Sequence, residues 1–147
     1  MQIKNKLVNH IMKNGEKKTS EKILLKSLKK IQKNSTKRSK NLIKLAIIYS
    51  TPVFKLHKII NNKKQKKKNK KIREIPAFIA KPLSRTSLAI KFILFNIKNK
   101  KSNSFDTKLK HEIFITAQSK GTSIELKNTL QKQVLLKKRL FNYYRWK

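Results

Sequence analysis

The sequence predicts a mostly α-helical protein, a six-helix bundle with a two-stranded β-ribbon inserted after the third helix. Apolar residues recur at helical spacing in six segments, and residues that end or begin helices separate these segments. Between the third and fourth segments, apolar and polar residues alternate with a period of two, which is typical of strands. A chain of 147 residues is long enough to bury a core, so we expect residues 1–147 to form a single domain.

Residues 3–50 contain the first three predicted helices, which cover 3–13, 19–33 and 38–50. Asn14 and Gly15 end the first helix, because both residue types tolerate the left-handed backbone that closes a helix. Thr19 is the predicted N-cap of the second helix. Pro52 prevents the third helix from continuing, since proline lacks an amide hydrogen and clashes with the preceding turn.

Residues 53–80 contain the predicted ribbon. Its two strands, 53–60 and 72–79, show the alternation, and Pro76 in the second strand indicates an edge or an exposed ribbon. Seven of the nine residues from 63 to 71 are lysine, and such a run cannot pack without counter-charge. We therefore predict a ribbon with a lysine-rich tip between its strands.

Residues 84–142 contain the last three predicted helices. Ser84 is the predicted cap of the fourth helix, and Asn103-Ser104 offers a cap for the fifth. Gly121 is expected to close the fifth helix before the last one, whose apolar positions run to Phe141. An aromatic and basic tail over residues 143–147 follows the last helix.

The charge of the chain indicates the class of ligand. The sequence has 40 Lys and Arg residues against 6 Asp and Glu, a formal net charge of +34, and therefore strongly attracts polyanions. The acidic residues are scattered singly and the histidines stand apart, so no general acid–base pair or metal clamp is recognisable. The absence of cysteine excludes disulfides and thiolate metal sites. We therefore predict no enzymatic activity, no metal site and no cofactor.

Four segments, spread in order over nearly the whole chain, resemble the family of ribosomal protein seven of the small subunit. They are residues 6–18, Lys81-Pro82 with Arg85, Leu88-Ala89 and Lys91-Phe92, Lys120-Gly121-Thr122, and Phe141 with Tyr144-Arg145-Trp146. The predicted order of helices and ribbon also resembles the architecture of that family. The resemblance implies a structural constituent of the small ribosomal subunit that binds the 3′ major (head) domain of its rRNA and nucleates assembly of the head.

The charge and the resemblance together predict the contact residues. For rRNA these are Lys17, Lys18, Lys37, Arg38, Lys55, Lys58, Lys63, Lys64, Lys81, Arg85 and Lys91. The resemblance implies that the ribbon and the carboxy-terminal segment lie near the exit-site tRNA and the mRNA path, through Lys66, Lys67, Lys68, Tyr143, Tyr144, Arg145 and Trp146. The expected partners are small-subunit rRNA, neighbouring head proteins, mRNA and exit-site tRNA. No membrane partner is expected, because no apolar run approaches the ~18–20 residues of a membrane span.

The sequence leaves one alternative for function and two for location. A nucleoid-type basic DNA-binding protein would share the charge and the exposed ribbon. The bias toward Lys, Asn and Ile, which A/T-rich codons encode, and the lack of an amino-terminal leader predict the small ribosomal subunit of a mitochondrion. A plastid and a bacterial cytoplasm are the alternative locations.

Overall fold

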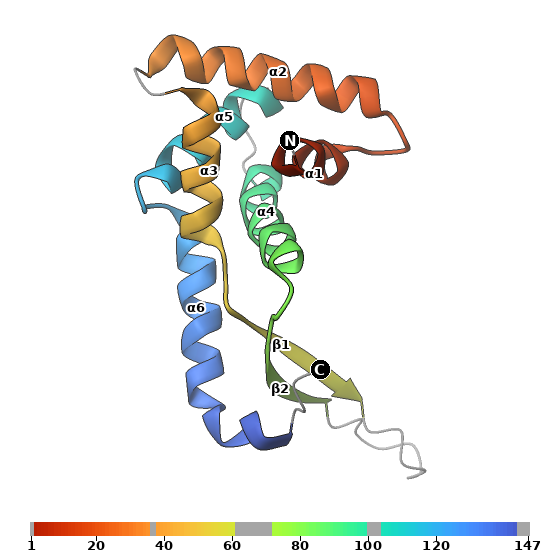
Figure 1. The fold of residues 1–147 in the computed structure, drawn as a ribbon, viewed down its shortest axis with the longest axis vertical. Coiled ribbons are helices and arrows are strands. Elements are labelled where there is room, and N and C mark those ends of the chain that lie inside the picture. Colours follow the sequence, from red (N-terminus) through yellow and green to blue (C-terminus); the bar gives the residue numbers. More distant parts are fainter. Residues whose placement is uncertain (1, 36–37, 61–71, 100–103, 144–147) are drawn as a thin grey trace.

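The computed structural model describes residues 2–35, 38–60, 72–99 and 104–143 (Figure 1). Its elements are α1 (Gln2–Ile11), α2 (Lys17–Asn34), α3 (Ser39–Ser50), β1 (Phe54–Ile60), β2 (Ile72–Phe78), α4 (Pro82–Asn99), α5 (Phe105–Ala117), α6 (Thr122–Leu136) and the 3-10 helix η1 (Lys138–Tyr143). The predicted fold class is confirmed, because the described residues form six α-helices with an antiparallel ribbon between the third and the fourth. Figure 1 shows α2 at one end of the long axis, and the ribbon and η1 toward the other.

Helix α4 lies at the centre of the hydrophobic core. Ala89, Ile90, Ile93 and Ile97 are at most 1% exposed and recur every one, three or four positions, so they form a single buried stripe along α4. The same core includes residues from four other helices: Leu7, Val8, Leu24, Ile31, Leu42, Ile43, Ala46, Ile47, Leu109 and Ile113. Burying one such isoleucine fully contributes roughly 2 kcal/mol, so this core fixes the helices relative to one another.

The turn between α1 and α2 agrees with the prediction, but the N-cap of α2 does not. Asn14 and Gly15 have φ of 50° and 78°, so the predicted left-handed turn after α1 is confirmed. Helix α2 begins at Lys17, two residues before the predicted N-cap. Thr19 therefore lies inside the first turn, where its hydroxyl donates to the Glu16 carbonyl at 2.7 Å. The prediction was wrong because the tight turn returns the chain to helical geometry immediately.

The ends of the later helices also differ from the prediction. Helix α4 begins at Pro82 and not at a Ser84 cap, because proline suits a first helical position, where no amide hydrogen is needed. The last helix ends at Leu136, and the chain continues as the 3-10 helix η1 where a continuous α-helix was predicted. The amide of Lys137 already bonds to the Val134 carbonyl, three residues back, which is the tighter 3-10 pattern.

Gly121 is required by the structure, although not for the predicted reason. Ser119, with φ of 57°, is the left-handed residue after α5, whereas Gly121 precedes α6 with φ of 95°. A Cβ atom at position 121 would lie 2.6 Å from Cγ2 of Ile115. Only glycine fits this junction without strain, since it combines a positive φ with a close approach to a packed side chain.

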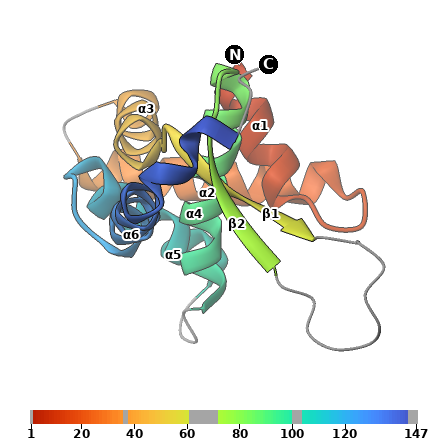
Figure 2. The ribbon, with the colours of Figure 1, turned by 90° about the horizontal axis from the view of Figure 1, so that it is seen from below.

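The ribbon is held to the carboxy-terminal part of the protein. Strand β1 pairs antiparallel with β2, with Leu56 opposite Pro76. In the described two-stranded sheet each strand is an edge strand, so the predicted edge position of Pro76 is confirmed, although the residue itself is buried. Strand β1 contacts α6 and strand β2 contacts η1, as Figure 2 shows, and the rings of Phe54 and Phe141 lie 5.5 Å apart. The predicted lysine-rich tip lies outside the described residues.

Candidate nucleic-acid interface

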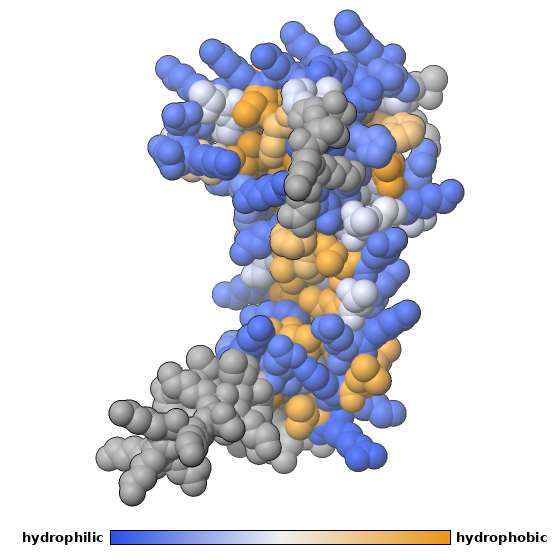
Figure 3. Space-filling view, turned by 180° about the vertical axis from the view of Figure 1, so that it is seen from behind, coloured by the Kyte–Doolittle hydropathy of each residue, from blue (hydrophilic) through white to orange (hydrophobic). Residues whose placement is uncertain are grey.

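Positive charge alone does not locate the interface. Figure 3 shows hydrophilic side chains projecting around one face of the molecule, with hydrophobic side chains gathered along its middle. Most individual lysines on such a surface are solvated charges. A binding site therefore has to be sought where several basic side chains are held together by folded elements and where no carboxylate neutralises them.

Among the grooves that meet both conditions is a shallow one between α1, β1 and α4, which we call the lysine groove. It is about 460 Å³ in volume and is lined by Lys6 of α1, Lys55 of β1, Lys91 of α4 and five further residues: Ile79, Leu83, Ser84, Ser87 and Leu88. No Asp or Glu lines it. Lys55 and Lys91, both predicted as rRNA contacts, are exposed there. Three elements distant in sequence thus bring their ammonium groups to one concave surface.

Lys6 is a groove residue that the sequence did not identify. Leu7 and Val8 are each 2% exposed, and their burial holds α1 against the core. The adjacent Lys6 then donates from Nζ to the carbonyl of Leu83 at 2.8 Å and to Oγ1 of Thr86 at 2.9 Å. These bonds use two of its three donors, so one remains for a ligand. No local pattern predicts these contacts, because the partners are 77 and 80 residues away in the sequence.

His10 links α1 to α4 beside the lysine groove, and the positive charge of the groove affects its pKa. Its Nε2 lies 3.0 Å from Oγ of Ser87. Burial lowers the pKa of His10 below the ordinary value of 6.5, and the positive charges of Lys91 and Lys6 lower it further. The imidazole is therefore neutral at pH 7, and part of its pKa shift is caused by the basic groove itself.

Arg85, a predicted rRNA contact, holds the groove together. Its Nε donates to the carbonyl of Ile79 at 2.6 Å, and its guanidinium carbon lies 4.8 Å from the centre of the Phe78 ring. These two contacts fasten the end of β2 to the first turn of α4. Lys81 is exposed in the turn between them, so it adds charge close to the groove.

The other predicted rRNA contacts do not converge on this groove. Lys17 and Lys18 are exposed in the first turn of α2, and Arg38 is exposed at the start of α3. Lys58 lies 3.7 Å from a carboxylate oxygen of Glu74. Tyr143 is the last residue of η1. The remaining predicted contacts lie outside the described residues: Lys37, Lys63, Lys64, Lys66, Lys67, Lys68, Tyr144, Arg145 and Trp146.

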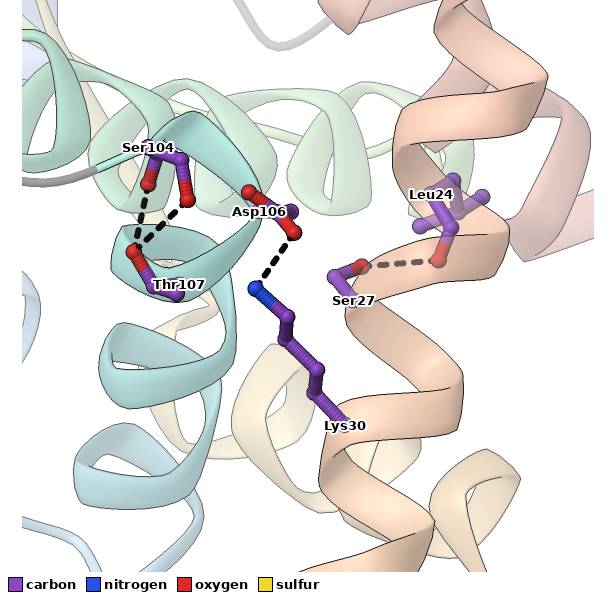
Figure 4. Close-up of polar contacts among 6 residues, drawn as sticks. All are labelled: Leu24, Ser27, Lys30, Ser104, Asp106 and Thr107. Atoms are coloured by element: carbon purple, nitrogen blue, oxygen red, sulfur yellow. Dashed lines mark hydrogen bonds and ion pairs between the residues drawn. The ribbon is translucent and has the colours of Figure 1, made fainter.

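Other basic side chains pair with carboxylates and serve the fold. Lys30 on α2 lies 2.7 Å from Asp106 on α5, as Figure 4 shows, so this pair joins two helices. The hydrogen bond from Lys30, followed by one from Ser104, lowers the pKa of Asp106 from 3.8 to about 2. Lys137 likewise donates to Glu74 on β2, and this hydrogen bond is the main reason that the pKa of Glu74 is lowered.

One carboxylate belongs to the core. Glu112 is 1% exposed and accepts a hydrogen bond from Oγ of Ser123 at 2.6 Å and from Nδ2 of Asn96 at 3.4 Å. It thereby joins α5 to α6 and α4, while the neighbouring His111 is exposed. Within the described ranges, no three His, Asp or Glu side chains are grouped so as to hold a metal ion. Among the described helices, none has the length and apolarity that crossing a membrane requires.

Comparison with known proteins assigns the family. The model of one family, described as ribosomal protein S7p/S5e, matches residues 1–137. The chain belongs to the ribosomal protein S7p/S5e family. Members of this family are structural, non-enzymatic components of the small ribosomal subunit, so the predicted family and the general function are confirmed.

Individual relatives are distant in sequence but similar over most of their length. The small ribosomal subunit protein uS7c of Euglena gracilis is 27% identical over 128 residues, which cover 87% of this chain and 77% of the relative. Protein uS7 of Pseudothermotoga lettingae is 28% identical over 141 residues, covering 96% and 85% respectively. Protein uS7 of Wigglesworthia glossinidia brevipalpis is 25% identical over 145 residues, covering 99% and 87%. The S7p/S5e relationship therefore includes both the helices and the ribbon.

Proposed function

We propose that this protein binds the 3′ major (head) domain of small-subunit rRNA through the lysine groove and thereby nucleates assembly of the head. The observation that carries the proposal is the convergence of Lys6, Lys55 and Lys91 on one concave surface without acidic lining. Helices and strands hold these residues in place, so less conformational entropy is lost on binding than for lysines on unstructured segments.

The chemistry of the groove suits an RNA backbone. Each lysine that neutralises a phosphate releases a counterion, which makes binding strong at low salt and insensitive to base sequence. The hydroxyls of Ser84 and Ser87 lie in the same groove and can exchange hydrogen bonds with ribose 2′-hydroxyls. Both serines are in the first two turns of α4, where the helix dipole adds to the positive field around Lys81.

We propose that the remaining predicted contacts extend the rRNA interface beyond the lysine groove. Lys17, Lys18 and Arg38 are exposed at helix starts, where they can reach further phosphates. The ribbon and the carboxy-terminal segment reach toward the exit-site tRNA and the mRNA path. The packing of β2 against η1 supports a joint position for these two segments. The family assignment argues against the nucleoid-type alternative.

Tethered hydroxyl-radical probing tests the proposed rRNA site directly. The chain has no cysteine, so Leu83→Cys places a unique iron chelate at the groove and Lys26→Cys places one on the outer side of α2. In assembled small subunits, we expect the groove probe to cleave the 3′ major domain strongly and the α2 probe to cleave it more weakly. Strong cleavage of another rRNA domain by the groove probe, or equal cleavage from both positions, would contradict the proposal.

We infer a mitochondrial location from the codon bias that the Lys-, Asn- and Ile-rich composition implies. Subcellular fractionation followed by sedimentation tests this inference. The protein is expected in mitochondrial small subunits, and its recovery in plastid or bacterial cytoplasmic subunits would replace that location by one of the two alternatives.

A further inference from the structure

A second groove lies where α1, α2 and α3 meet, and its chemistry differs from that of the lysine groove. Its volume is about 790 Å³, and the apolar residues lining it are Ile3, Leu7, Leu24, Leu25, Leu28 and Ile43. Figure 1 shows α2 running across α1 and the start of α3. Residues of all three helices line the groove. We call it the α1–α3 groove.

Part of the apolar lining of the α1–α3 groove is open to solvent. Leu25 is 46% exposed, and Ile3 and Leu28 are half-buried. A concave, mainly apolar surface of this size is comparable to the sites that bind side chains of a partner. Exposed leucine in such a surface is desolvated when an apolar side chain packs on it, and this favours association.

All charged residues on the rim of the groove are basic. Lys4, Arg38, Lys40 and Lys44 surround the apolar floor and are all exposed, and no Asp or Glu lines the groove. The occupant therefore needs two features together. It must carry apolar side chains for the floor and negative charges for the rim. An RNA backbone supplies the charge but not the apolar anchors.

This chain cannot supply such an occupant itself. A second copy carries the same net charge of +34, and its acidic residues are scattered. Of these residues, Glu112 is buried, while Glu74 and Asp106 are paired with lysines. The segment 61–71, which the structure does not describe, is rich in lysine and would repel the basic rim. The occupant has to come from another molecule.

We propose that the α1–α3 groove binds an acidic amphipathic helix of another protein of the small subunit. Leucine-like residues of that helix, spaced three or four apart, pack on Leu25 and Leu28, which are three positions apart along α2, and on Ile3 of α1. Flanking Asp or Glu residues pair with Lys4, Lys40 and Lys44 on the rim. This site shares no residue with the lysine groove, although Arg38 on its rim is also a predicted rRNA contact. The proposal rests on the apolar lining and on Lys4, Lys40 and Lys44, and not on Arg38.

A designed peptide provides the first test. The probe is a fluorescent helical peptide of about 16 residues with leucines on one face and glutamates on the other, and its control has the same composition in scrambled order. With the full-length protein at about 0.15 M salt, we expect the amphipathic peptide to bind at least about tenfold more tightly, a difference of about 1.4 kcal/mol. Equal binding of the two peptides would overturn the proposal, since only charge would then be recognised.

Matched variants locate the binding in the groove. Leu25→Glu is expected to weaken binding of the amphipathic peptide about tenfold, whereas Leu135→Glu, at a leucine 63% exposed on α6, leaves it within about twofold. Circular dichroism checks that both exposed substitutions leave the helices intact. Replacing Lys4, Lys40 and Lys44 by glutamate is expected to weaken binding more than the same change at Lys22, Lys26 and Lys29 on α2. The proposal would be overturned if the two leucine variants lost equal peptide affinity, or if the two triple-lysine variants did.

The assembled subunit provides the second test. A photoreactive benzoylphenylalanine replaces Leu25, and the full-length protein is incorporated into small subunits before irradiation. We expect a crosslink to an acidic amphipathic segment of a neighbouring protein. A crosslink to rRNA alone, or no crosslink in subunits that contain the variant, would overturn the proposal.

Discussion

The lysine groove and the contact between α2 and α5 use the same residue type for opposite purposes. Between α2 and α5, Lys30 lies 2.7 Å from Asp106, and this ion pair holds the two helices together. In the groove, Lys55 and Lys91 are exposed and no acidic residue is present. In a chain with a net charge of +34, a lysine that pairs with a carboxylate serves the fold, whereas a groove without carboxylates is open to a polyanion.

Three of the acidic residues support this view. Asp106 and Glu74 pair with lysines from other elements, and Glu112 is buried between three helices. Asp106 and Glu74 join parts of the protein that are distant in sequence, and Glu112 joins α5 to α4 and α6. These three carboxylates therefore stabilise the fold, and none of them lines the lysine groove.

Removing the buried carboxylate is expected to have the largest effect on the framework. Glu112→Ala leaves Ser123 and Asn96 without this acceptor and opens a cavity, so we expect the free energy of unfolding to fall by about 3 kcal/mol. Glu125→Ala, at an exposed position on α6, is the matched control and should change it by about 0.5 kcal/mol or less. Urea unfolding measures both values, and similar values for the two variants would show that Glu112 is not part of the framework.

Arg85 lies beside the lysine groove, but its contacts stabilise the fold. Arg85→Ala removes the bond to Ile79 and the contact with the Phe78 ring, so the free energy of unfolding should fall by about 2 kcal/mol. Lys81→Ala, at an exposed position nearby, should leave stability nearly unchanged while weakening RNA binding. Thermal unfolding separates the two cases. A stability loss at Lys81 and none at Arg85 would reverse the assigned roles.

The smallest expected effect concerns the pair between α2 and α5, because Lys30 is 42% exposed and its charge is screened by solvent. Asp106→Asn should lower the free energy of unfolding by about 1 kcal/mol at pH 7. The pKa of Asp106 is depressed from 3.8 to about 2 in the folded protein, so its stabilisation is present above pH 4 and is lost as the pH falls toward 2. Urea unfolding of both proteins at several pH values measures this. A difference that persists unchanged at pH 2 would exclude the ion pair as its cause.

The sequence predicted the elements of the fold because their patterns are local. The buried stripe of α4 is visible as a helical repeat, and the ribbon is visible as alternation. The ends of helices were predicted less accurately. At Thr19 and at Lys137, the choice between an α-helix, a 3-10 turn and a loop depends on how neighbouring elements pack, and single residues do not encode this choice.

The candidate site was only partly predictable for a related reason. Lys55, Lys81 and Lys91 were identified from charge and resemblance, but Lys6 was missed and Arg85 was given a role in binding alone. Their contacts depend on α1, β2 and α4 meeting in space. The burial of Glu112 was equally invisible, since its partners Asn96 and Ser123 come from different helices.

The salt dependence of rRNA binding tests the central claim most directly. Filter binding to a head-domain rRNA fragment compares the wild type with two triple-alanine variants of equal charge: Lys55, Lys81 and Lys91 around the groove, and Lys22, Lys26 and Lys29 exposed on α2. The groove variant is expected to bind about a hundredfold more weakly, and the slope of log affinity against log salt should fall in magnitude by about 2, because three phosphate contacts are lost. The affinity of the α2 variant should fall by less than about threefold, and its slope of log affinity against log salt should stay close to that of the wild type. Equal losses of affinity and slope in the two variants would contradict the claim that the lysine groove is where this protein holds RNA.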